Sequence, residues 1–170
     1  MKVLKAVRIV KLPDGWIAAG FVRNLVWDRL HDYPQCTPLN DVDVIYYNVK
    51  DTSELAEKEY ESRLRTLIPD VPWSVKNQAR MHIKNGDLQY KSISESLCHW
   101  CETPTSIGVR LNNDDSLELI APLGIDDLVS GICRATPFTL QKPGKIDDYR
   151  QRVKDKKWQA LWPNLKIHDL

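Results

Sequence analysis

The sequence has few features of secreted, membrane-spanning or strongly charged proteins. No hydrophobic run is long enough to span a bilayer, and charged residues interrupt the N-terminal apolar stretch at Lys2, Lys5, Arg8 and Lys11. The net charge is only +1, from 24 Lys and Arg against 23 Asp and Glu, which gives no general attraction to nucleic acid or to an anionic membrane. We therefore expect a cytoplasmic protein without a membrane partner.

Cysteine is also scarce, with four residues in 170. A chain of this length can bury a sizeable core and does not need disulfides, so we expect reduced thiols. Cys98 and Cys101 flank a histidine, but a structural zinc ion takes four ligands and no second close pair exists, so inward packing from a helix is favoured. A Walker-type glycine loop and a Ser-His-Asp order are missing, which argues against those two site types.

Apolar periodicity predicts helices alternating with strands in the first half of the chain. Helices are expected at residues 1–11, 22–30, 53–67, 92–101, 126–133 and 146–160, and strands at 16–19, 42–48, 73–78, 107–111 and 117–120. Residues 79–83 fit either an extension of the preceding strand or a short helix, and residues 137–144 are expected to form a loop. Without repeats or linkers, the pattern favours a single α/β domain over residues 1–170. It would have a mixed sheet, flanking helices and a packed basic C-terminal helix.

Two acidic residues, Asp41 and Asp43, lead into the β-branched and aromatic run of the second strand. Side chains two positions apart share one face of a strand, so both carboxylates can point at one spot. They repel each other unless a cation lies between them, and aspartate oxygens suit Mg²⁺ or Mn²⁺. The alternative is structural: Asp41 caps a turn before the strand and Asp43 faces solvent.

Gly20 and Arg23 lie where the first strand passes into a helix. The free backbone N–H groups and positive end of that helix, with the guanidinium of Arg23, form a potential cradle for phosphate. The alternative for Arg23 is a surface position paired with Asp28 or another acid.

These two segments resemble the nucleotidyltransferase superfamily that includes DNA polymerase beta and the CCA-adding enzymes. In that superfamily a glycine-led turn receives the triphosphate and an Asp-x-Asp pair coordinates Mg²⁺. Residues 20–24 are similar to its Gly-Gly-x-Val-Arg-Asp signature, with Phe21 in place of the second glycine and Asn24 in place of the acid. Stretches at 19–28, 41–46, 73–82 and 121–128 resemble, in the same order, a bacterial-type nucleotidyltransferase-like family without a settled substrate.

The resemblance implies a nucleotidyltransferase-like fold and a metal-dependent reaction. A nucleoside monophosphate would pass from an NTP to an unidentified acceptor (a small molecule, a protein or an RNA end), with release of pyrophosphate. The metal ligands and catalytic acids would be Asp41 and Asp43. The nucleotide-binding residues would be Gly20, Phe21, Arg23, Asn24, Lys76, Asn77 and Arg80.

The third carboxylate of such a site is not at the usual strand, because residues 73–78 contain none. Glu118 in the hairpin strand is the candidate, ahead of the turn residues Asp114 and Asp115. Two alternatives stay open. The protein is a non-catalytic nucleotide sensor or interaction module on the same fold, or it binds RNA through its basic C-terminal helix, although packing explains that helix equally well.

Overall fold

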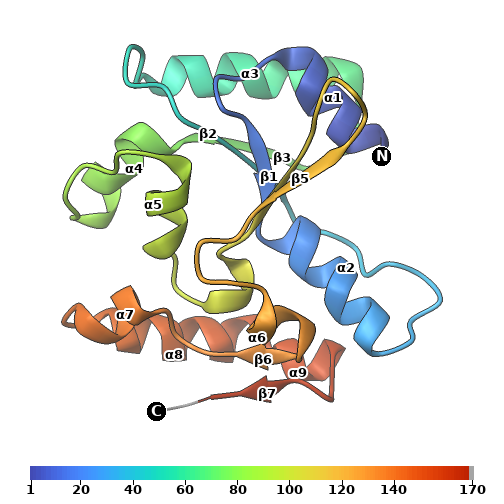
Figure 1. The fold of residues 1–170 in the computed structure, drawn as a ribbon, viewed down its shortest axis with the longest axis vertical. Coiled ribbons are helices and arrows are strands. Elements are labelled where there is room, and N and C mark those ends of the chain that lie inside the picture. Colours follow the sequence, from blue (N-terminus) through green and yellow to red (C-terminus); the bar gives the residue numbers. More distant parts are fainter. Residues whose placement is uncertain (169–170) are drawn as a thin grey trace.

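The computed structural model describes residues 1–168, in which helices cover a five-stranded mixed sheet (Figure 1). The strands are β1 (Trp16–Ala18), β2 (Val42–Tyr46), β3 (Trp73–Asn77), β4 (Gly108–Leu111) and β5 (Leu117–Ile120). Their order is β3-β2-β1-β4-β5; β2 and β3 are parallel, and the other neighbours are antiparallel. A parallel pair needs a crossover, which α3 (Glu54–Leu67) supplies. The expected fold class is confirmed.

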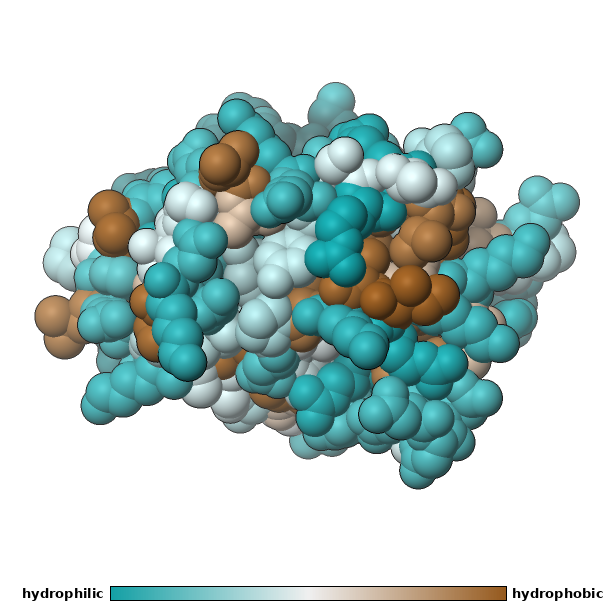
Figure 2. All heavy atoms as spheres, turned by 90° about the horizontal axis from the view of Figure 1, so that it is seen from above, coloured by the Kyte–Doolittle hydropathy of each residue, from teal (hydrophilic) through white to brown (hydrophobic). Residues whose placement is uncertain are grey.

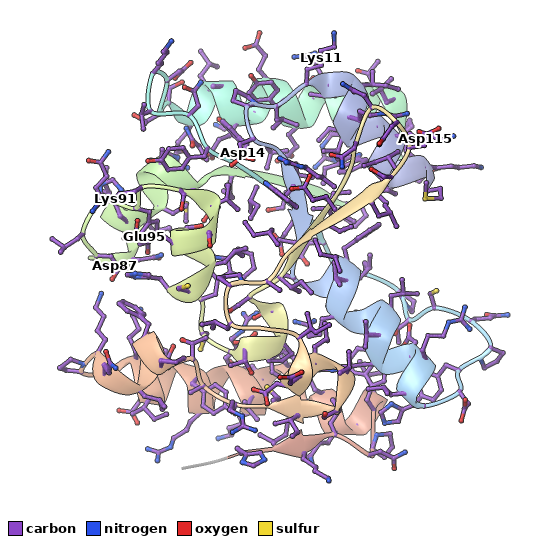
Figure 3. All side chains as sticks on the ribbon, in the orientation of Figure 1. Lys11, Asp14, Asp87, Lys91, Glu95 and Asp115 are labelled. Atoms are coloured by element: carbon purple, nitrogen blue, oxygen red, sulfur yellow. The ribbon has the colours of Figure 1, made fainter. Side chains whose placement is uncertain are left out.

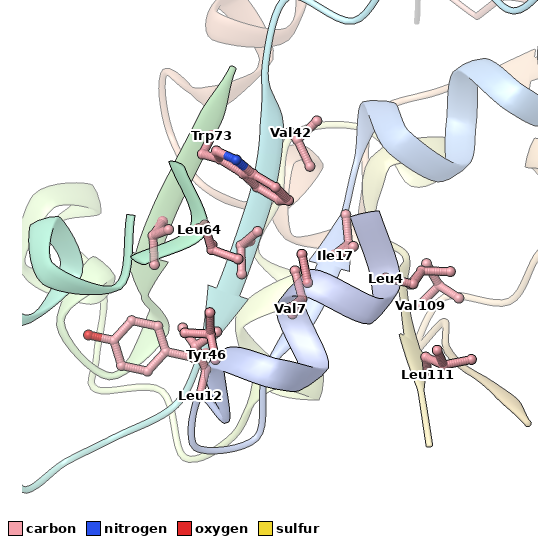
Figure 4. Packing of buried hydrophobic residues seen from close by; sticks show 14 residues of the cluster. Leu4, Val7, Leu12, Ile17, Val42, Tyr46, Leu64, Trp73, Val109 and Leu111 are labelled. Carbon is pink, nitrogen blue, oxygen red and sulfur yellow. The ribbon is translucent and has the colours of Figure 1, made fainter. Parts of the chain in front are cut away.

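One face of the sheet packs against α1 (Lys2–Val10) and α3. Alternation along β2 turns Val42, Val44 and Tyr46 toward these helices, where Leu4 and Leu64 complete part of a large apolar core (Figure 4). The opposite, outward side of these two helices is mostly hydrophilic, with one larger group of hydrophobic side chains (Figure 2). Neither these helices nor any other in residues 1–168 is long and apolar enough to cross a membrane.

The second face of the sheet carries a smaller core. Trp16, Ala18 and Ile45 pack there against Ile93 and Leu97 of α5 (Ile93–Cys98). Since Asp43 lies between two residues that face α1 and α3, the same alternation points it toward this second face.

The chain after β5 forms a separate layer below the sheet in Figure 1. It contains α6 (Asp126–Val129), β6 (Ile132–Cys133), α7 (Pro137–Gln141), α8 (Lys145–Lys156), α9 (Trp158–Leu161) and β7 (Lys166–Ile167). The 3₁₀ turn η1 (Thr103–Thr105), which comes before β4 in the chain, packs against α6 and β6 of this layer. Its core joins α2 (Gly20–Leu30) through Trp27, whose ring meets those of Trp158 and Trp162 edge-on at 5.7 and 5.2 Å. Trp162 Nε1 also donates to Asp28 Oδ1 at 2.8 Å, across 134 residues.

A buried ionic contact joins this lower layer to the segment between α4 (Gln78–Asn85) and α5. Asp87, on that segment, faces the lower layer (Figure 3) and accepts from Lys142 and Tyr90. The two layers are thus linked on the side away from α2.

Several element boundaries differ from the sequence expectations. The undecided residues 79–83 are helical, because the Asn77 side chain caps α4 through the N–H of Ala79 at 3.1 Å. Helix α5 ends at Cys98, so Cys101 lies beyond it rather than on the same helical face. The expected loop at 137–144 contains α7, and the expected helix at 126–133 stops at Val129 before β6. The two-residue strands β6 and β7 are too short for periodicity to predict.

Candidate functional site

The two aspartates lie at the start of β2, on the side of the sheet that faces the lower layer. Asp41 is exposed just before the strand, and Asp43 is half-buried within it. Burial, followed by the charge of Asp41, raises the pKa of Asp43 above its ordinary value of 3.8, while a hydrogen bond with Ser74 on β3 opposes the rise. The contribution of Asp41 to this rise indicates that its carboxylate lies near that of Asp43.

The turn before α2 lies beside this pair and begins the helix without a side-chain cap from the described residues. The first bonded amides are those of Val22 and Arg23, which donate to the Ala19 carbonyl at 3.1 and 2.9 Å. The N–H groups of Gly20 and Phe21 precede them, at positions that have no partner within the helix. A Cβ on Gly20 would lie 3.5 Å from Arg23 Nη2, so glycine leaves the space beside that guanidinium open.

The residue in the special backbone conformation of this turn is Ala19. Its φ of 51° and ψ of −120° belong to the first central position of a type II′ turn, which glycine favours. Phe21, expected to replace a glycine of the turn, is already helical and packs against the main core. The backbone conformation that favours glycine therefore falls on Ala19, one residue before Gly20.

Ala19→Gly is expected to leave stability unchanged or to raise it slightly. Relief of the positive φ contributes of order 1 kcal/mol, and the greater freedom of glycine in the unfolded chain offsets about the same amount. Ala19→Val, with a β-branched side chain at the same φ, should be clearly destabilising. Urea denaturation of the three proteins measures this, and equal midpoints for the Gly and Val variants would show that the turn carries no strain.

Arg23 is buried under this turn, and within residues 1–168 no acidic side chain forms an ion pair with it. Only 7 % of the residue is exposed, and its Nη2 and Nε donate to Asn24 Oδ1 at 2.9 and 3.2 Å. Its guanidinium lies 5.2 and 4.9 Å from the ring centroids of Trp27 and Trp158, and burial lowers its pKa to about 10. Asn24 is neutral, so no directly bound acid neutralises Arg23, and the charge of Glu102 acts on it only from further away.

Two residues that the sequence did not single out as a pair complete the site from the lower layer. Arg152 of α8 donates from Nε to both oxygens of Glu102, at 2.8 and 2.9 Å, and Glu102 is fully buried. The charge of Arg152 only partly opposes the raised pKa of Asp43. Helix α8 also supplies Lys156 to a cavity of about 100 Å³, which Gly20, Arg23, Asp41 and Trp158 line as well.

Glu118, the expected third acid, is not brought to the aspartates. It lies on β5, three strands from β2, and both of its oxygens bind Arg110 at 2.9 and 3.0 Å on the neighbouring strand. Asp114 and Asp115 lie in the turn of the same hairpin, where Asp115 pairs with Arg8 of α1 (Figure 3).

The hydrogen-bond donors of β3 and the start of α4, which are expected near the nucleotide, bind other groups of the protein. Arg80 binds the buried carboxylate of Glu57 through two hydrogen bonds of 2.7 Å, and Lys76 adds an ion pair at 3.4 Å. The buried side chain of Asn77 caps α4 and holds the carbonyls of Asn48 and Asp51 at 2.8 and 2.9 Å. In the strand register Asn77 pairs with Tyr46, at the opposite end of β2 from Asp43. These residues form a structural network in which Arg80 is helical rather than on a strand face.

Comparison with known families and structures identifies the chain. A family model described as nucleotidyltransferase matches residues 5–167. The chain belongs to this nucleotidyltransferase family. A solved structure described as revealing a CCA-adding enzyme head domain is similar to this chain with a TM-score of 0.87 and 32 % identity, over 99 % of this chain and 88 % of the other.

More distant structures share the fold. A CCA-adding enzyme in complex with CTP has a TM-score of 0.61 at 18 % identity, over 98 % of this chain and 38 % of its own. The Thermotoga maritima CCA-adding enzyme complexed with tRNA has a TM-score of 0.59 at 18 % identity, over 98 % and 38 %. The chain therefore spans about two fifths of the length of those enzymes. No curated protein sequence matches it.

The carboxylates at this site fit a hard divalent cation. Residues 1–168 contain no cluster of three or more His, Cys, Asp or Glu side chains that could hold a metal by themselves. Mg²⁺, however, is commonly bound by one or two carboxylates together with water and substrate phosphates. Asp41 and Asp43, two neighbouring carboxylates beside a cavity, match that pattern.

Proposed function

We propose that this protein is a Mg²⁺- or Mn²⁺-dependent nucleotidyltransferase that moves a nucleoside monophosphate from an NTP to an acceptor hydroxyl. The observation that carries the proposal is the meeting of Asp41 and Asp43 with a helix end that begins without a side-chain cap and with a buried Arg23 whose hydrogen bonds go to the neutral Asn24. Anionic oxygens and cationic donors then face one site, which suits a metal-bound polyphosphate.

Each part of the site has a distinct task in this proposal. Asp41 and Asp43 would hold the cation, which when bound polarises phosphate oxygens and lowers the pKa of an attacking hydroxyl. The amides of Gly20 and Phe21 would donate to phosphate oxygens at the helix end. Arg23 would offset the remaining charge, with Asn24 fixing its guanidinium.

The reaction exchanges one bond to phosphorus for another. The acceptor oxygen forms a bond to the α-phosphorus, and the bond from that phosphorus to the bridging oxygen breaks. Pyrophosphate leaves, and the hydroxyl proton passes to solvent. The protein contributes mainly position and charge stabilisation, because phosphoryl transfer needs little covalent chemistry from side chains.

Transfer of label from NTP tests the proposal. The protein is incubated with each α-labelled NTP, Mg²⁺ and a fractionated cell extract, and labelled products are separated by size. We expect a product that depends on Mg²⁺ and is lost with Asp41→Asn. Lys58→Gln, an exposed change on α3, serves as the matched control and should leave transfer intact. A complete absence of labelled product with all four NTPs would count against catalysis.

A second candidate, nucleotide binding without turnover, is favoured by one observation: Glu118 binds Arg110 rather than approaching Asp43. A site with two acids can hold a metal nucleotide and still lack a base for the acceptor hydroxyl. This candidate predicts saturable binding of Mg²⁺·NTP in calorimetry with no detectable pyrophosphate release. Absence of binding with and without Mg²⁺ would eliminate it.

A further inference from the structure

A second guanidinium, that of Arg152 on α8, lies next to the site and is only partly used by the protein. Its Nε is held by both oxygens of Glu102, whose side chain is 0 % exposed, while 39 % of the Arg152 side chain is exposed. Within residues 1–168 no hydrogen bond engages its two Nη atoms. A guanidinium held by Nε keeps a planar fork of N–H groups for a bidentate partner.

Helix α8 brings Arg152 next to the cavity of the site. Lys156, one turn further along α8, lines the cavity that Gly20, Arg23 and Asp41 also line. Arg152 lines the adjoining hollow together with Lys156. The Nη groups of Arg152 therefore lie beside the cavity on the side of Lys156, where a ligand that bears anionic oxygens can meet them.

Arg152 also belongs to a cluster of cations that share one aromatic ring. The guanidinium groups of Arg23 and Arg152 lie 4.9 and 5.9 Å from the ring centroid of Trp158, and Lys156 lines the same cavity as Arg23. Arg152 and Lys156 are four residues apart on α8, which places them on one face about 6 Å apart along the helix. Glu102 is the one buried carboxylate among these three cations.

We infer that Arg152 binds the polyphosphate of the nucleotide through its Nη groups, and that Glu102 is the positioning residue that aims it. This inference rests on the proposed function and extends it, because it makes helix α8 part of the substrate site. The excess of cations favours a polyphosphate over an acceptor hydroxyl, which carries no charge for a guanidinium to bind. Helix α8 then acts on the nucleotide rather than on RNA, the other partner considered for its basic residues.

Calorimetric titration with Mg²⁺·NTP and with Mg²⁺-tripolyphosphate tests the inference. Arg152→Gln should weaken binding of both probes about tenfold to a hundredfold, as expected for loss of charge-assisted hydrogen bonds. Arg152→Lys, which keeps the charge but loses the fork, should fall between Gln and wild type. Lys154→Gln removes one charge from an exposed position of the same helix and should bind like wild type.

The outcomes separate this inference from the proposed function. If wild type binds both probes and Arg152→Gln binds them equally well, the role of Arg152 is refuted while the proposed function stands. If wild type binds none of the four NTPs, the proposed function fails and this inference fails with it. Glu102→Gln tests the positioning role: a folded variant, verified by its melting temperature, should lose affinity, and unchanged affinity would remove that role. Should Arg152→Gln not fold, the affinity of Arg152→Lys decides by the same criterion.

Discussion

Replacing Asp43 with Asn is expected to lower nucleotidyl transfer about a thousandfold. Removal of one of two metal-binding carboxylates forfeits several kcal/mol of charge stabilisation in the transition state, and each 1.36 kcal/mol corresponds to a factor of ten. The rate of pyrophosphate release under saturating Mg²⁺·NTP measures the effect. The amide keeps the size of the side chain, so packing around β2 should not change.

The same substitution should not destabilise the metal-free protein. Burial and Asp41 raise the pKa of Asp43 in the folded state, so its favourable contribution is complete below about pH 3.8 and is lost as the pH rises through the folded pKa. At neutral pH the wild type therefore carries an unfavourable charge that Asn removes. Thermal melting at pH 7 without metal should show an equal or higher melting temperature for Asp43→Asn. A clearly lower value would mean that the carboxylate has a structural role instead.

Added Mg²⁺ provides the matched control for this interpretation. An ion that binds the folded state stabilises it by mass action, so the melting temperature of wild type should rise with Mg²⁺ and nucleotide, and that of Asp43→Asn should not. Ser74→Ala, which removes the hydrogen bond to Asp43 but no charge, should keep most of the Mg²⁺ response.

Replacing Arg80 with Met is expected to destabilise the fold by about 3 to 5 kcal/mol. The change leaves the carboxylate of Glu57, whose side chain is 3 % exposed, without its bidentate partner, and a buried charge that loses its partner is strongly unfavourable. Urea denaturation at pH 7 measures the loss. Arg65→Met, at an exposed ion pair on α3, is the matched control and should change stability little.

The pH dependence of stability gives an independent check. Burial alone would raise the pKa of Glu57, but the hydrogen bonds from Arg80 and Asn77 outweigh burial and lower it below 4.5. Its contribution is therefore present above about pH 4.5 and is lost as the pH falls through the folded pKa. Arg80→Met should weaken this loss in acid. If the variant is instead as stable as wild type but binds Mg²⁺·NTP poorly, Arg80 is a nucleotide-binding residue after all.

Sequence reasoning predicts the parts of this fold that local patterns determine. The apolar stripe of α1, the Ser53 cap of α3 and the alternation of β2 are set within a few residues, and the structure contains all three. The short helix α4 was undecided because Trp73–Gln78 alternates like a strand, and only the cap formed by Asn77 ends that pattern.

The contribution of the C-terminal layer could not be predicted in the same way. Arg152 lies more than a hundred residues after Asp43, and the pattern of α8 shows which residues face inward but not what they face. Glu102 lies outside any long element, so no periodicity marks it as buried. Lys76 and Arg80 were expected near the nucleotide because donors crowd there, whereas long-range pairing with Glu57 engages them. Local patterns thus indicate the part of the site formed by the turn before α2 and the start of β2. The part formed by α8 and Glu102 depends on tertiary packing.

The contact between Trp162 and Asp28 has a consequence for how the protein is made. The indole of Trp162, which is translated 134 residues after Asp28, forms a hydrogen bond with that residue of helix α2. The ring of Trp158, from the same late segment, packs against the guanidinium of Arg23. A nascent chain that ends before Trp158 already contains Asp41, Asp43 and the turn at Gly20. It still lacks the contacts of Trp158 and Trp162 with helix α2. Competence to retain nucleotide should therefore arise late in translation, as a single step, rather than grow with the length of the chain.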